Sequence, residues 1–289
     1  MKVARTPDEL EGRDRSVALG SFDGVHLGHR RVLDAAKEAG SPATVVTFWP
    51  HPRLVLGYRV ELLSTLRRRL ELVDAAGIEE ALVLEFTAEL ASLEPAEFAE
   101  AVLRRIGARV IAVGENFRFG RGAAGDAEVL ERSGFEVLSV PLVEGVSSTE
   151  IRSRVRAGDV GGAAKLLGRP PEVEGEVVAG ERRGGTLGYP TANLAVPSEL
   201  LVPSHGIYAG AAHGHRAAVS IGVNPHYRGV ERRVEVHLID FSGDLYGERL
   251  VVELWQRLRD EQAFASEEEL VRQIGRDVEQ TRKAVRLPS

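Results

Sequence analysis

The stretch SVALGSFDGVHLGHRRVLDAAKEAG, residues 16–40, has the pattern of a strand, a tight turn and a helix in direct succession. Residues 16–20 form a short apolar run, which is typical of a strand buried on both faces. The turn SFDG follows at 21–24, and the helical pattern after it stops at Gly40. A strand followed at once by a helix is the repeating unit of an α/β fold.

The same alternation continues to about residue 160. Four further apolar runs have the length and composition of buried strands, at residues 43–48, 81–86, 108–114 and 135–140. Two of the intervening segments carry apolar residues at helical spacing, namely Leu63, Leu66, Leu70 and Val73 in one and Phe98, Val102 and Ile106 in the other. Gly77 and Gly107 stand where these helices should stop, and the three arginines at 67–69 are expected on a solvated helix side. Five such repeats predict a doubly wound, Rossmann-like α/β domain whose ligand binds at the carboxyl ends of its strands.

The pattern changes after LLGRPPEVEG, residues 166–175, where two prolines follow a short helical segment. We therefore expect one domain over residues 1–168 and a second over 169–289. From about 173 to 256 the apolar segments are short and separated by glycine and polar turns, which predicts a small antiparallel β-barrel.

The chain then ends in an amphipathic segment that predicts one terminal α-helix. Ser266 and Glu269 have the spacing of a capping box. The apolar residues expected on one face of this helix are Leu270, Ile274, Val278 and Val285.

Composition excludes several classes of protein. The chain of 289 residues has no cysteine, which removes disulfides, thiolate nucleophiles and thiolate zinc sites. Its net charge of −6 argues against non-specific binding to nucleic acid, which is itself negatively charged. No run of the sequence approaches the ~20 apolar residues that a membrane-spanning helix needs. The first residues carry charge before any apolar stretch, unlike a secretory signal. We expect a cytoplasmic protein with small-molecule partners.

His26 and His29 are two of only eight histidines, and they lie at the start of the first predicted helix. Their i, i+3 spacing places both on one face. Unpaired backbone N–H groups and the helix dipole favour an anion such as phosphate there, and two imidazoles could add hydrogen bonds to it. Surface capping of the helix is about equally compatible with this pair alone, whereas metal binding is less favoured because no third ligand follows at a suitable spacing.

The segment GSFDGVHLGH, residues 20–29, resembles the HxGH signature of nucleotidyltransferases, specifically the adenylyltransferase half of prokaryotic bifunctional riboflavin kinase/FAD synthetases. TFWPHP (47–52), GENFRFG (114–120) and SSTEIR (147–152) match later blocks of that family in the same order. The resemblance implies ATP binding by Gly20, Phe22, Asp23, Gly24, His26, His29, Ser147, Ser148, Thr149 and Arg152, with catalytic roles for the two histidines. It implies flavin binding by Pro50, His51, Pro52, Asn116 and Phe117. From the residues alone, at least one of Phe117 and Phe119 is expected to be plain core.

The second half resembles riboflavin kinases through GERRGGTLGYPTANL (180–194), GIYAG (206–210) and RVEVHLIDF (233–241). The resemblance implies Mg²⁺ ligation by Thr191 and Asn193 and a general base at Glu235. It further implies ATP contacts from Gly184, Gly188 and Tyr189 and a flavin contact from Asn224. Alternation along 233–241 places Glu235 on the face opposite to Val234 and Val236, where its default role is that of a solvated carboxylate.

The chain departs from the kinase pattern at four places. These are Gly185, where a basic residue is expected, Tyr189 for the usual Phe, Ser220 for the common Asn, and NPHY at 224–227. They bear on the efficiency of the kinase and on its affinity for substrates.

The resemblance covers essentially the whole chain. It implies an enzyme that phosphorylates riboflavin with ATP to give FMN and then adenylylates FMN to FAD, releasing pyrophosphate, with Mg²⁺ as cofactor. Two alternatives remain at this point: an adenylyltransferase for another small phosphate with a regulatory flavin-binding barrel, and a flavin-binding protein without turnover.

Overall fold

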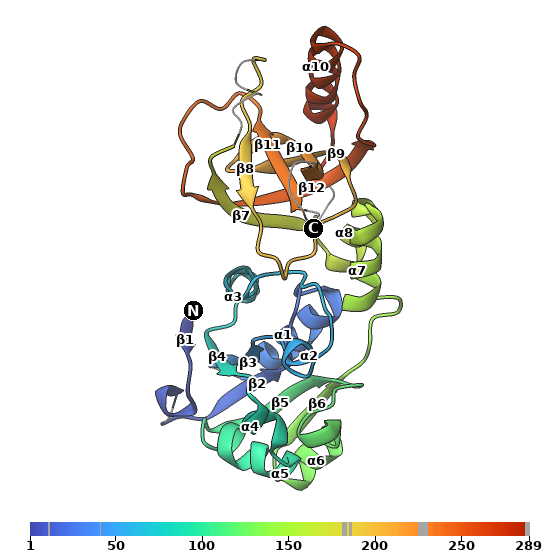
Figure 1. Ribbon diagram of the computed structural model, residues 1–289. Helices are drawn as coiled ribbons and strands as arrows, with labels where there is room; N and C mark the ends of the chain where they lie inside the picture. Colours follow the sequence, from blue (N-terminus) through green and yellow to red (C-terminus); the bar gives the residue numbers. More distant parts are fainter. Residues whose placement is uncertain (11, 41, 181–183, 185–186, 225–230, 287–289) are drawn as a thin grey trace. The chain divides into compact units, whose positions relative to one another are not determined.

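The computed structural model describes the chain except residues 11, 41, 181–183, 185–186, 225–230 and 287–289. It divides into two compact units, Met1–Ser148 and Thr149–Ser289 (Figure 1). Among the described residues, none of the helices combines the length and the apolar character that crossing a membrane requires.

The first unit is built on a parallel sheet of six strands in the order β1-β4-β3-β2-β5-β6. The strands are β1 (Lys2–Ala4), β2 (Arg15–Leu19), β3 (Ala43–Trp49), β4 (Glu80–Glu85), β5 (Ala108–Gly114) and β6 (Glu136–Val140). All five predicted strands are present, which confirms the doubly wound prediction. The additional edge strand β1 has only three residues, of which Ala4 alone is buried, so it has no periodicity that could have been recognised.

Helices lie between these strands. They are α1 (Leu27–Ala39), α2 (Pro52–Val55), α3 (Leu66–Ala75), α4 (Ala88–Ser92), α5 (Pro95–Phe98) with its π-helical continuation η2 (Ala99–Arg104), and α6 (Ala127–Arg132), besides the short 3₁₀ segments η1 (Pro7–Leu10) and η3 (Arg121–Ala123). Gly77 and Gly107 adopt positive φ just after the helical segments they were expected to end. Because each glycine tolerates that left-handed backbone, it stops its helix at the predicted place.

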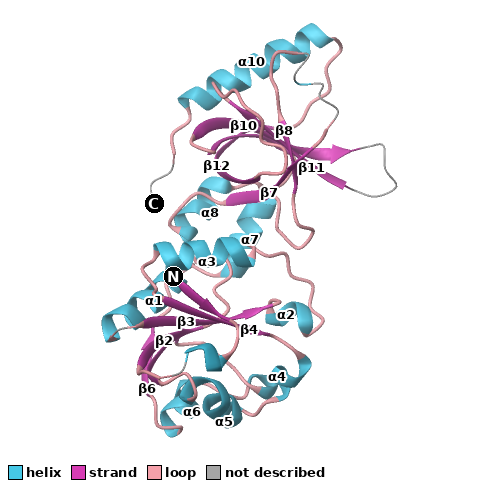
Figure 2. Ribbon diagram, turned by 90° about the vertical axis from the view of Figure 1, so that its left-hand side faces the viewer, coloured by secondary structure: helices cyan, strands magenta, loops and turns pink. Residues whose placement is uncertain are grey.

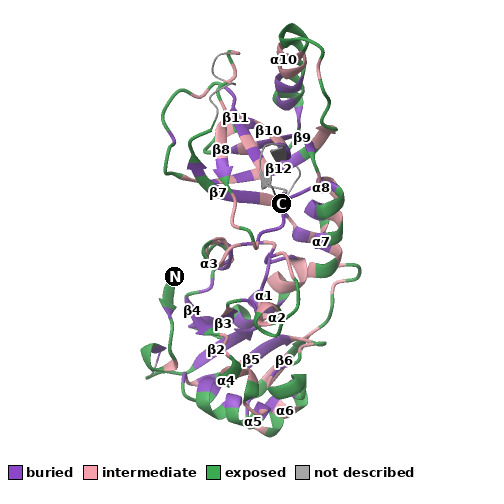
Figure 3. Cartoon of the chain, viewed as in Figure 1, coloured by how far each residue is buried: buried purple, intermediate pink, exposed green. Residues whose placement is uncertain are grey.

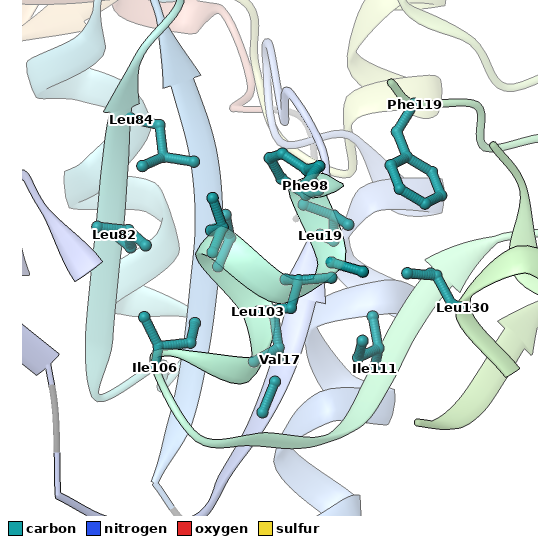
Figure 4. Packing of buried hydrophobic residues seen from close by; sticks show 14 of the residues in the cluster. Val17, Leu19, Leu82, Leu84, Phe98, Leu103, Ile106, Ile111, Phe119 and Leu130 are labelled. Carbon is teal, nitrogen blue, oxygen red and sulfur yellow. The ribbon is translucent and has the colours of Figure 1, made fainter. Parts of the chain in front are cut away.

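Two apolar clusters cover the two faces of the sheet. Val17 and Leu19 pack with Phe98 and Leu103 on one face (Figure 4), whereas Ala18 packs with residues of α1 and α3 on the other. Successive residues of β2 therefore serve opposite cores, as a strand buried on both faces requires. Figure 3 shows this strand as buried along its length.

The prediction that all three arginines at 67–69 face solvent is wrong for Arg69. The Arg67 side chain is 72% exposed, whereas Arg69 is 0% exposed. Successive residues of an α-helix are about 100° apart, so three consecutive side chains cannot share one face.

The second unit contains α7 (Ser148–Ala157), which begins at the last residue of the first unit, then α8 (Val160–Leu167), a closed barrel and α10 (Glu267–Lys283). The barrel order is β10-β11-β8-β7-β12-β9, and all six pairings are antiparallel. The strands are β7 (Glu172–Val178), β8 (Ala192–Ala195), β9 (Gly206–Ala212), β10 (His215–Asn224), β11 (Glu231–Leu238) and β12 (Arg249–Arg259). This closed strand order and the helix α10 confirm the predicted barrel and terminal helix; Figure 2 labels α10 and all of these strands except β9.

The start of α10 is close to the prediction. The Ser266 side chain accepts a hydrogen bond from the Glu269 backbone N–H, while the Glu269 carboxylate accepts from Ala265 N–H at 3.1 Å. At the other end the prediction fails, because the chain leaves the helix at Ala284 and Val285 is 77% exposed.

The two compact units divide between Ser148 and Thr149, at the start of α7, rather than at residue 168. Val160 of α8 is buried in the same apolar cluster as the barrel strands, which groups α8 with the barrel. The division of the two activities at residues 168/169 stays a prediction.

Candidate active sites in the two units

The turn between β2 and α1 has an unusual backbone. Phe22, Gly24 and Val25 have φ of +51°, +81° and +39°, so three of four consecutive residues are in the left-handed region. A Cβ at Gly24 would lie 2.8 Å from Leu63 Cδ1, so this position requires glycine for space as well as for conformation. The turn carries the chain from the carboxyl end of β2 to the N-terminus of α1.

His26 is the N-cap of α1, and its Nδ1 accepts a hydrogen bond from His29 N–H at 3.2 Å. The two imidazole rings stack with centroids 3.6 Å apart, and the ring of Phe22 meets His29 edge-on at 5.3 Å. The pair thus lies together as its spacing predicted. His26 does cap the helix, but at 7% exposure it is not a surface cap. Because Nδ1 accepts a bond, the neutral ring carries its proton on Nε2, where it can be donated to a ligand.

Asp23 fastens the turn to the chain that enters α3. Its buried carboxylate accepts hydrogen bonds from Leu63 N–H at 3.1 Å and from Ser64 N–H at 3.2 Å. The Ser64 hydroxyl accepts from Gly24 N–H, and the Ser148 hydroxyl donates to the Asp23 carbonyl oxygen at 3.3 Å. This fastening is the observed role of Asp23, and its direct contact with ATP stays a prediction.

The other residues predicted for the first unit follow β2, β3 and β5. Parallel order β3-β2-β5 brings the carboxyl ends of these strands to one edge, so Gly20, Pro50 to Pro52 and Asn116 are placed along it. His51 caps α2, accepting from Arg53 N–H at 3.2 Å, with Pro52 as the first helical residue. Asn116 is exposed.

The two phenylalanines of the 114–120 block differ in burial. Phe119 is 7% exposed and packs against Phe98 in the core. This confirms the expectation that at least one of the two phenylalanines is a core residue. Phe117 stacks on Phe119 at 5.8 Å and is only partly buried. The flavin contact of Phe117 stays a prediction.

Residues predicted from SSTEIR are divided between the units. Ser147 and Ser148 end the first unit, whereas Thr149 and Arg152 belong to the second. Ser147 and Thr149 are exposed, and Arg152 is buried on α7. Contact of Thr149 and Arg152 with ATP phosphates stays a prediction.

The second unit contains a cavity of about 310 Å³ between the barrel and α10. Asn193, Glu235 and Ser220 are successive Cα partners across β8, β11 and β10, and all three line this cavity. Thr191 and Tyr189 line it too, while Leu270 and Ile274 contribute from α10. The structure therefore brings five of the predicted kinase residues, Gly184, Tyr189, Thr191, Asn193 and Glu235, to one cavity, to which α10 adds Asp277 as well as its apolar residues; Gly188 does not line it.

Glu235 lies in this row as the alternation predicted. Its neighbours Val234 and Val236 are each 1% exposed in the barrel core, whereas the Glu235 side chain is 25% exposed and lines the cavity. Arg233 Nη1 lies 3.7 Å from Glu235 Oε1. A carboxylate in this position can accept a proton from a hydroxyl group that enters the cavity.

Glycines leave space around the predicted magnesium ligands. A Cβ at Gly180 would collide with the Asn193 amide, and one at Gly184 would lie 3.2 Å from Thr191 Oγ1. Gly188, at φ +84°, adopts a backbone that favours glycine. The hydroxyl and amide oxygens of Thr191 and Asn193 are hard donors, which suit Mg²⁺ when phosphates and water complete its coordination.

Sequence reasoning gave no role to several polar residues that line the cavity of the second unit, among them Arg233 and His237. Arg233 and His237 line the cavity on the same strand face as Glu235, and His237 Nδ1 lies 2.8 Å from the Pro190 carbonyl oxygen. Their i±2 spacing from Glu235 was the signal that could have found them. The Asn224 side chain, Gly185 and His226 lie outside the described residues, so nothing is said of their predicted contacts.

Comparisons with known proteins agree for both halves. The profile of the family described as FAD synthetase matches residues 8–155, and that of riboflavin kinase matches residues 167–285. Bifunctional riboflavin kinase/FMN adenylyltransferases from Pseudomonas fluorescens and Listeria monocytogenes are 37% and 32% identical, each over 96% of this chain and over 95% and 94% of the relatives. A crystal structure named as a macrolide-efflux protein from Streptococcus pneumoniae has 34% identity and a TM-score of 0.88, covering 98% of this chain and 99% of that one.

Proposed function

The chain belongs to the family of bifunctional riboflavin kinase/FMN adenylyltransferases, and we propose which of its residues perform the two reactions. The enzyme phosphorylates riboflavin with ATP to give FMN, and it adenylylates FMN with ATP to give FAD. An adenylyltransferase for another phosphate would not account for the match to both families. A cytoplasmic location remains a proposal from the sequence.

The kinase reaction is assigned to the cavity of the second unit. Glu235 accepts the proton of the riboflavin hydroxyl as that hydroxyl oxygen attacks the γ-phosphorus of ATP, and ADP leaves as the bond to the β–γ bridging oxygen breaks. Thr191 and Asn193 would hold Mg²⁺, which would neutralise charge on the phosphates of ATP. Leu270 and Ile274 offer an apolar wall to the flavin rings. The row of Asn193, Glu235 and Ser220 on one cavity wall is the observation that carries this assignment.

The adenylyltransferase reaction is assigned to the turn before α1. The phosphate of FMN attacks the α-phosphorus of ATP, and pyrophosphate leaves. His26 and His29 donate hydrogen bonds to phosphoryl oxygens as negative charge builds up on them, at the positive end of the helix dipole. The chain needs no covalent intermediate, because FMN brings its own nucleophile. Rate enhancement then comes from orientation and electrostatics.

One incubation tests both assignments. The full chain is supplied with riboflavin, ATP and Mg²⁺, and riboflavin, FMN and FAD are separated by chromatography over time. FMN should appear first and FAD after it. The His29→Ala variant should accumulate FMN, and the Glu235→Gln variant should leave riboflavin unchanged; the reverse pattern would overturn the assignment of the chemistry to the two units.

A further inference from the structure

A fully buried arginine lies beside the adenylyltransferase turn. Arg69 is 0% exposed on α3. Its Nη2 lies 3.5 Å from Asp23 Oδ1, its Nη1 donates to the Phe48 carbonyl oxygen at 3.4 Å, and its guanidinium lies 5.7 Å from the centre of the Trp49 ring. Arg69 thereby connects α3, the carboxyl end of β3 and the turn after β2.

Stability alone does not require a charged pair at this position. Burying an arginine and an aspartate removes both from water, and replacing such a pair by apolar side chains of similar size is often neutral or stabilising. Removal of one partner alone, by contrast, leaves a buried charge. A pair with this cost is better explained by the geometry it maintains.

The geometry in question is the strained turn. Phe22 and Val25 hold left-handed φ values without being glycine, and for a β-branched residue such as Val25 this is a rare and unfavourable conformation. A strained backbone conformation of this kind persists only where several contacts from the surrounding structure hold it in place. Asp23 lies between these two residues, and its carboxylate bonds to Leu63 N–H and Ser64 N–H on one side while facing Arg69 on the other. His26 follows Val25 directly.

We propose that Arg69 is a positioning residue for FMN adenylylation. Acting through Asp23, it keeps the turn 22–25 in its strained conformation, so that His26 and His29 are held ready for the phosphates. Arg69 itself touches no substrate. This inference rests on the proposed role of the two histidines.

The variants are made in the full chain, where riboflavin phosphorylation reports on the second unit in the same sample. Arg69→Met removes the cation, and Arg69→Lys keeps it. Because Arg69→Met removes the guanidinium from beside the buried Asp23 carboxylate, the double variant Arg69→Met/Asp23→Asn replaces both members of the pair by neutral side chains and so avoids breaking a buried ion pair on one side only. The matched control is Arg15→Met/Glu80→Gln, which neutralises another buried pair, with a 2.7 Å contact, at the amino ends of β2 and β4.

Turnover, the KM for FMN and the thermal midpoint are measured for each variant. The kcat of FAD formation should fall about a hundredfold in Arg69→Met and in the double variant, because small misplacements of catalytic groups cost this much. KM for FMN should change little, Arg69→Lys should restore most of kcat, and the control should keep its kcat per folded enzyme.

A folded double variant with wild-type kcat would overturn the proposal, as would an equal loss of kcat in the control. The His29→Ala variant distinguishes a failure of the role proposed for Arg69 from a failure of the role proposed for the two histidines. If His29→Ala impairs FAD formation and the Arg69 variants do not, the role of Arg69 alone is wrong. If His29→Ala has no effect, the role proposed for the histidines falls, and that of Arg69 with it.

Discussion

Glu235→Gln separates catalysis from stability in the kinase cavity. The substitution keeps the size of the side chain and removes its capacity to accept a proton. Loss of a general base lowers turnover by about a hundredfold to ten-thousandfold. At about 1.36 kcal/mol for each factor of ten, the barrier to phosphoryl transfer should rise by roughly 2.7 to 5.4 kcal/mol.

The cost in folding free energy should be far smaller. Glu235 is partly exposed, and its ion pair with Arg233 spans 3.7 Å between side chains that are 25% and 41% exposed. Pairs of this kind contribute roughly 0 to 1 kcal/mol. The thermal midpoint should therefore move little while FMN formation collapses.

The assay follows FMN from riboflavin and, separately, FAD from supplied FMN. FAD formation should persist, because it is assigned to the other unit. Glu176→Gln is the matched control, since it makes the same change at an exposed position of β7 outside the cavity and should retain full kinase activity. Wild-type phosphorylation by Glu235→Gln would refute the assignment and leave this carboxylate as an ordinary polar residue of its strand.

His29→Ala should lower the kcat of FAD formation about a hundredfold and leave FMN formation unchanged, as measured by chromatography; a stoichiometric zinc ion in elemental analysis of the wild type would contradict the phosphate role. Thr191→Val should raise the Mg²⁺ concentration needed for half-maximal FMN formation, and a titration curve equal to that of the wild type would exclude this residue as a ligand. Burial by itself would raise the pKa of Glu80, but hydrogen bonds from Arg15 and Arg13 outweigh it and hold the pKa below its usual range. Since a depressed carboxyl pKa stabilises the folded state above the unfolded pKa, the first unit should lose stability as the pH falls below about 4.5, and Glu80→Gln should flatten this dependence in acid unfolding curves. A fragment of residues 149–289 should make FMN but not FAD and should resist urea better than one of residues 169–289. The shorter fragment exposes the barrel surface that Val160 covers, and one such side chain is worth about 1.5 to 3 kcal/mol; equal urea midpoints would contradict this reasoning.

Local patterns in the sequence were sufficient for the architecture. Strand and helix periodicities are set by residues within a few positions of one another, so five of the six strands of the parallel sheet, the barrel and the terminal helix could all be predicted. The same applies to Glu235, whose side of β11 follows from its alternation with Val234 and Val236. His26 and His29 also meet, because the side chain of an N-cap residue folds back towards the residue three positions later, here to accept a hydrogen bond from its backbone N–H.

Only the tertiary structure decided which distant residues these elements contact. Nothing near Arg69 in the sequence indicates that it is buried against Asp23, 46 positions earlier, or that the Asp23 carboxylate turns towards Leu63 and Ser64. The row of Asn193, Glu235 and Ser220 depends on the register of three strands, and a slip by one residue would turn one member away from the cavity. Periodicity specifies which face of an element is apolar, whereas register and the partners of buried charges are settled by packing between segments that are distant in the chain.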